Sequence, residues 1–171
     1  MSHALLAHWT AGFLLIVMAS FALIEVKSSS LIPKSLFLWP FAGFLFGFLT
    51  LLSPIMMKGH DWNQTTLAAL GVAAVLASIQ ALLVNIRKIS SWPSGAIWLG
   101  FLVVGILYQI PYESLQEPLF RGFIRRLTGF VWAAIGITKV IGDKTVSQGS
   151  GIPAWILLTY VQAILIASLS H

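Results

Sequence analysis

The feature that most constrains this chain is a run of uncharged, mostly apolar residues from Ser35 to Met56. A helix of that length crosses the roughly 30 Å hydrocarbon core of a bilayer. Comparable runs recur along the chain, and they lack the apolar–polar alternation of barrel strands. We therefore predict an all-α, polytopic membrane helical bundle. It has about six transmembrane helices in three hairpins, within one integral membrane domain over residues 1–171; the spans are 5–25, 35–56, 66–86, 95–112, 127–142 and 153–170.

Composition supports the same class. Hydrophobic residues make up 58% of the chain and charged residues 9%, whereas about a quarter of a soluble domain is charged. The net charge of +5 is carried mostly by short segments beside the spans, where it sets topology and contacts anionic head groups. Nucleic acid is therefore not an expected partner. The absence of cysteine excludes disulfides, thiolate metal sites, iron–sulfur clusters and haem attached through cysteine.

The distribution of Lys and Arg predicts an orientation. Six spans place both termini on one side, and the opposite side receives six of the ten basic residues. The positive-inside rule then favours a multi-pass protein whose termini lie outside the cytoplasm, which is the periplasmic side if the membrane is the inner (plasma) membrane of a bacterium. In this topology all four histidines lie at the terminal side. We expect the first apolar segment to be retained as a span, because no positive charge precedes it.

Small and amphipathic residues predict how the spans pack. Gly43 and Gly47 are four residues apart, a spacing that lets membrane helices approach closely. The polar connection 113–126 predicts a short helix in the interface, separate from the fifth span. Lys139 lies within that span and is expected to snorkel towards its end. Tryptophans near the span ends, including Trp39 and Trp155, predict an aromatic belt.

One polar cluster could hold a metal. Met56 ends the second span, Met57 and His60 follow it closely, and His8 lies at the start of the first. Thioether and imidazole ligands suit copper, and methionine favours the cuprous ion. The alternative is that the methionines finish an apolar span and His60 is a solvated loop residue. A haem would need paired axial ligands; His8 and His60 could serve only near one interface, so haem is the less favoured cofactor.

Several of these residues form a pattern that resembles a known protein family. His8-Trp-Thr-Ala-Gly12 opens one span, Glu25 lies at the following turn, and Leu38-Trp39-Pro40 opens the next span before His60 and a small-residue third span. Over about residues 5–113 this pattern resembles the bacterial copper-resistance D (CopD/PcoD-like) membrane proteins. The resemblance implies copper handling on the periplasmic side of the inner membrane, with His8 and His60 at the ligand positions.

Three functions remain open at this point. The first is copper binding or transfer at the periplasmic face. The second is a non-catalytic accessory or scaffolding subunit, whose partners are the lipid bilayer and other membrane subunits or further copies of the chain. The third is a haem- or quinone-linked redox subunit. An enzyme is the least favoured class, because no catalytic triad, His-Glu-x-x-His motif or phosphate-binding loop occurs.

Overall fold

A computed structural model of the protein describes residues 3–27, 37–56, 62–86, 95–110, 119–145 and 152–168. Within these ranges helices are the only regular secondary structure and no strand occurs, as the sequence predicts. The elements are α1 (His3–Lys27), α2 (Leu38–Met56), α3 (Trp62–Asn85), the 3₁₀ turn η2 (Gly95–Leu99) that continues into α5 (Gly100–Leu107), α6 (Leu119–Thr145) and α7 (Ala154–Ser168).

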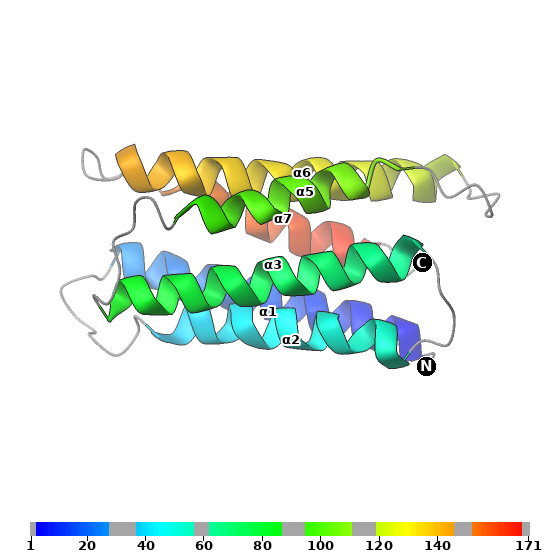
Figure 1. The fold of residues 1–171 in the computed structure, drawn as a ribbon, viewed down its shortest axis with the longest axis horizontal. Coiled ribbons are helices and arrows are strands. Elements are labelled where there is room, and N and C mark those ends of the chain that lie inside the picture. Colours follow the sequence, from blue (N-terminus) through cyan, green and yellow to red (C-terminus); the bar gives the residue numbers. More distant parts are fainter. Residues whose placement is uncertain are drawn as a thin grey trace.

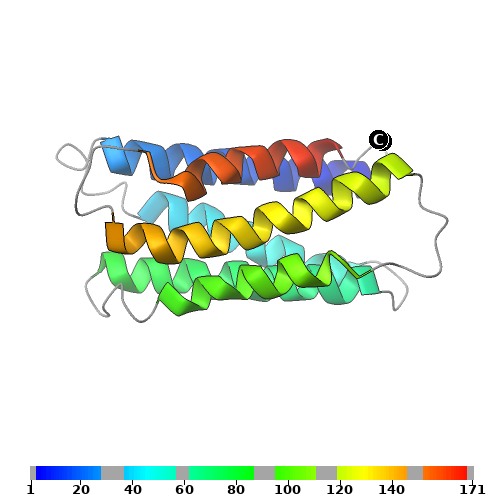
Figure 2. The ribbon, with the colours of Figure 1, turned by 90° about the horizontal axis from the view of Figure 1, so that it is seen from above.

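The helices form two layers of three. Helices α1, α2 and α3 make one layer, and α5, α6 and α7 make the other, as Figures 1 and 2 show from two directions. Successive helices run antiparallel, and contacts between α1 and α7 and between α3 and α5 join the layers at their edges. The helices of each predicted hairpin do pack against each other: α1 with α2, α3 with η2 and α5, and α6 with α7. The most extensive packing is between α2 and α3, which belong to different predicted hairpins.

Glycines explain the close approach of α2 and α3. A Cβ atom at Gly47 would lie 2.8 Å from the backbone nitrogen of Val75, and one at Gly71 would lie 2.9 Å from the carbonyl oxygen of Gly47. A Cβ atom at Gly43 would lie 2.6 Å from Ser78 Oγ. Gly43 and Gly47 thus lie against α3, where a side chain would hold the two backbones apart.

Helix α6 corrects the prediction of a separate interfacial helix. The part of the connection that the structure describes, from Leu119 onwards, is continuous with the fifth span in one 27-residue helix. The physical reason is that Pro118 directly precedes the helix and no proline interrupts it. Its inward residues recur at spacings of three and four, the period of a helix packed along its length: Arg125, Thr128, Trp132, Ile135 and Lys139.

The outer surface of the bundle is apolar. Large side chains such as Phe13, Phe130 and Ile164 are 64–65% exposed, while amide and hydroxyl side chains such as Gln162 and Thr159 are fully buried. Two helical stretches are both long and apolar enough to cross a membrane, His8–Lys27 and Gln64–Asn85. Leu38–Ser53, Gly95–Leu107 and Ala154–Ser168 are shorter apolar helices.

Candidate functional site

At one end of the bundle, each of the six helical stretches contributes one polar or aromatic residue, when η2 and α5 are counted as one stretch. This is the end at which α1, α3 and α6 finish and α2, η2 and α7 begin, on the left of Figure 1; we call it the box end. The six residues are Glu25 from α1, Trp39 from α2, Gln80 from α3, Trp98 from η2, Lys139 from α6 and Trp155 from α7. These positions are far apart in the sequence, and only the antiparallel packing brings them together.

Three of these residues surround a cation. The ammonium nitrogen of Lys139 lies 4.7 Å from the ring centroid of Trp155 and 5.6 Å from those of Trp39 and Trp98. We call these three indoles the tryptophan box. Their ring centroids are 5.4–6.2 Å apart and their planes are tilted by 40–49°, so the rings form three walls instead of a flat stack. Each wall is within the distance at which an aromatic face attracts a cation.

Two walls of the box are fixed by polar contacts of their own. Trp98 Nε1 donates a hydrogen bond of 2.9 Å to Gln80 Oε1, and the Trp39 side chain hydrogen-bonds to the Glu25 carboxylate. All three indoles are only 3–5% exposed. Because buried indole N–H groups generally need an acceptor, Gln80 and Glu25 help to hold the rings in place.

Glu25 also supplies the opposite charge. Its carboxylate and the Lys139 ammonium attract each other, and both side chains are half-buried. Of the two carboxylate oxygens of Glu25, Oε2 is buried and accepts no hydrogen bond. The box end can therefore hold one cation between aromatic faces and a carboxylate, with an acceptor to spare.

Lys139 was predicted to snorkel towards the end of its span, and the three rings that its Nζ contacts lie at that end of the bundle, the box end. The predicted aromatic belt is wrong for Trp39 and Trp155, which are buried, whereas Trp9 is 50% exposed as a belt residue would be. Sequence position alone places a tryptophan near a span end but not on the inner or outer face. An ionisable residue inside a span is the signal that could have identified the site.

The second inward cation of α6 has a different environment. Arg125, 9% exposed, lies near the other end of the helix. Its Nη1 donates hydrogen bonds to the carbonyl oxygens of Tyr108 (3.1 Å) and Ile110 (2.8 Å). These carbonyls belong to the C-cap residue of α5 and to the turn that follows its last residue, Leu107, a place where backbone carbonyls lack intrahelical donors. Arg125 therefore caps α5.

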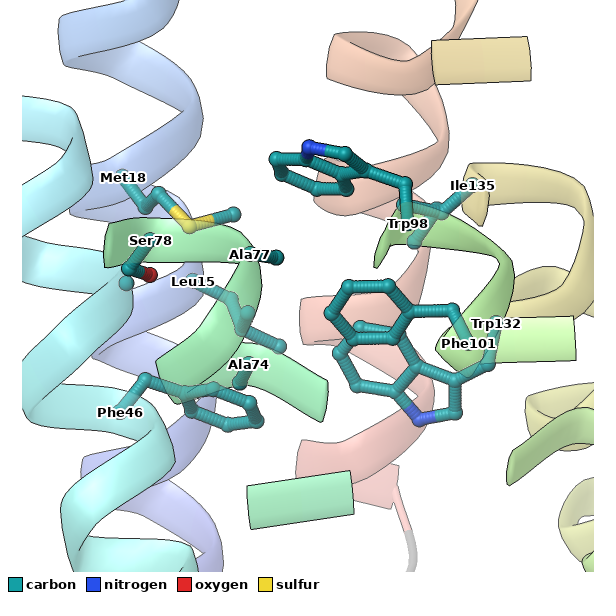
Figure 3. Close-up of a pocket in the computed structure, with 11 residues that line it drawn as sticks. Leu15, Met18, Phe46, Ala74, Ala77, Ser78, Trp98, Phe101, Trp132 and Ile135 are labelled. Atoms are coloured by element: carbon teal, nitrogen blue, oxygen red, sulfur yellow. The ribbon is translucent and has the colours of Figure 1, made fainter. Parts of the chain in front are cut away.

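Between the layers lies a small cavity of about 20 Å³. Figure 3 shows aromatic side chains lining this space, and the Phe101 and Trp132 rings stack with centroids 5.2 Å apart. A volume of that size is close to what a single water molecule requires. The lining is almost entirely apolar, with Ser78 as its one hydroxyl residue.

The predicted copper ligands are placed only in part. His8 is a half-buried residue of α1, and Met56 is the last residue of α2; both lie at the end opposite the box. Met57 and His60 lie outside the described residues. Among the residues that the structure describes, no three His, Asp or Glu side chains gather as metal ligands would.

A comparison of the chain with protein-family models, with curated proteins and with solved structures found no match.

Proposed function

We propose that this chain is an integral membrane protein that crosses the bilayer six times and acts as a non-catalytic accessory or scaffolding subunit. The observation that carries the proposal is the distribution of side chains. Many large apolar residues, such as Phe13, Phe130 and Ile164, are exposed, whereas the polar residues Gln80, Arg125 and Gln162 are buried and Lys139 is half-buried. Lipid is the solvent in which that distribution is favourable.

The helix contacts agree with this proposal. Membrane helices associate through small residues that let backbones approach, and α5 meets α6 in that way: a Cβ atom at Gly105 would lie 2.6 Å from the carbonyl oxygen of Gly129. Aromatic rings pack between the layers around the small cavity described above. A bundle packed in this way is suited to hold a fixed shape within a membrane assembly.

The topology can be tested by thiol labelling, because the natural chain contains no cysteine. Single cysteines would be introduced by Ser2→Cys, Ser114→Cys and Ser170→Cys for one side, and by Ser29→Cys, Ser91→Cys and Ser147→Cys for the other. In intact bacterial cells, a membrane-impermeant maleimide should label only one of these two groups; detergent should expose both. Labelling that mixes members of the groups, or release of the protein from membranes by alkaline carbonate, would contradict six spans.

Copper handling is the second candidate. Because α1 and α2 pack antiparallel, the start of α1, which carries His8, lies at the same end of the bundle as the last residue of α2, Met56. Met57 and His60 follow Met56 in the sequence. Elemental analysis of the purified protein should then show near-stoichiometric copper that is lost in the double variant His8→Ala/His60→Ala. Equal copper content in both proteins would contradict this candidate and leave the accessory role.

A further inference from the structure

We propose that the tryptophan box is a binding site for a primary alkylammonium group, either of a free amine or of an ethanolamine lipid head group, and that Lys139 occupies the site until such a ligand displaces it. Three aromatic faces at 4.7–5.6 Å from one ammonium nitrogen show that the box accepts this chemical group. Aromatic cages of this kind bind ammonium ligands in other proteins.

The walls of the box are anchored independently of Lys139. Trp98 is hydrogen-bonded to Gln80 on α3, and Trp39 to Glu25 on α1. Trp155 lies in the first turn of α7, where Ile156 N donates to the carbonyl oxygen of Pro153 at 3.0 Å. Removal of the lysine side chain from the box would therefore leave three rings in place around a space of ammonium size.

The occupant can leave the site. Lys139 is half-buried and lies less than two turns before the end of α6 at Thr145. A lysine stem is long and flexible, so its ammonium can reach the helix end and be solvated there. Three of the contacts that hold it are aromatic faces, and these attract a cation without requiring a fixed donor direction.

Glu25 selects the class of cation. Its Oε2 is buried without a hydrogen-bond partner, so an incoming group with N–H donors gains a charge-assisted hydrogen bond there. A primary ammonium has such donors and a quaternary ammonium has none. Glu25 also neutralises the positive charge of whichever ammonium occupies the box.

The test measures displacement with ethanolamine hydrochloride. The full-length protein in detergent is titrated while tryptophan fluorescence and heat of binding are followed, with sodium chloride at equal ionic strength as the reference. Lys139→Met removes the internal competitor, and it should saturate at a concentration at least about tenfold lower than the natural chain. Choline chloride should saturate Lys139→Met more weakly than ethanolamine does.

Matched variants locate the binding. Lys139→Met/Trp155→Leu should lose the saturable response, and Lys139→Met/Trp9→Phe should keep it, because Trp9 is exposed and remote from the box. If Lys139→Met fails to fold by circular dichroism and gel filtration, Lys139→Gln replaces it. A folded variant at position 139 that responds to ethanolamine only as it does to sodium chloride would overturn the proposal.

A second experiment distinguishes a lipid head group from a free amine as the source of the ammonium group. It rests on the proposed membrane topology, which the thiol labelling tests independently. Native mass spectrometry of Lys139→Met from nanodiscs should show retained phosphatidylethanolamine, but not phosphatidylglycerol, if the ligand is a head group. Ethanolamine binding in detergent without lipid retention identifies a free amine. Absence of both responses rejects the site.

Discussion

Helix α6 carries two inward-facing basic side chains whose positive charges are stabilised in different ways. Arg125 donates to two backbone carbonyls, and Lys139 lies between three indole faces near a carboxylate. The two residues are fourteen positions apart, so the rise of the helix separates them by about 21 Å and places them near opposite ends of the bundle. The sequence of α6 gives no hint of this difference, which is set entirely by the neighbouring helices.

The contrast follows from the chemistry of the two side chains. A guanidinium is a planar fork of directed donors and suits fixed acceptors, whereas an ammonium is a compact charge on a flexible stem. Arg125 therefore fixes the end of α5, and we expect its removal to destabilise the bundle. Lys139 is held by less directional contacts, so we expect its site to tolerate exchange.

The largest effect is expected at the arginine. Arg125→Met removes the donor for two carbonyls in a buried region, and the loss in unfolding free energy should be about 3 kcal/mol. Arg125→Lys should recover less than half of it, because a single ammonium does not reproduce the fork. Denaturation in mixed detergent micelles, followed by circular dichroism, measures the change.

Arg126→Met is the matched control, since Arg126 is exposed and adjacent in sequence. Its unfolding free energy should stay within about 0.5 kcal/mol of the natural chain. Equal destabilisation by the two methionine variants would show that charge on α6, and not the capping of α5, is what stabilises this end.

The comparison also shows where sequence reasoning succeeds. Apolar runs predicted helices whose bounds the structure places within a few residues for α1, α2, α3 and α7. Such runs are local, so helix formation can be read from them. The prediction was wrong for the separate interfacial helix. The amphipathic polar stretch indicates a helix of its own, but no proline separates it from the fifth span, and one helix runs from Leu119 to Thr145.

The site lay beyond sequence reasoning for a different reason. Lys139, Glu25 and the three tryptophans come from five separate helical segments, and the spacing within any one segment says nothing about the others. Hydropathy showed only that Lys139 was an ionisable residue in an apolar span. The copper prediction stays a prediction, because two of its four residues lie outside the described chain.

A smaller effect is expected for the Lys139–Glu25 pair. Glu25→Gln should lower the unfolding free energy by about 1–2 kcal/mol; breaking a fully buried pair costs about 3–5 kcal/mol, and both of these side chains are only half-buried. Glu25→Gln/Lys139→Met should cost less than the sum of the two single variants, since each single change leaves one charge without its partner. Strictly additive values would show that Glu25 does not interact with the box cation.

The smallest changes in unfolding free energy are expected at two glutamines near opposite ends of the bundle, Gln80 and Gln109. Gln80→Leu leaves the buried Trp98 N–H without its acceptor, and the expected loss is about 1 kcal/mol. Gln109 donates to Arg126 O at 3.0 Å near the surface, where water can replace the bond, so Gln109→Leu should cost about 0.5 kcal/mol or less. The two variants should also differ in spectroscopy: only Gln80→Leu should shift the tryptophan emission, because only it frees a wall of the box.

If Gln80→Leu left both the stability and the emission unchanged, Trp98 would be held by packing alone. The box would then depend on its aromatic neighbours and not on its polar anchors.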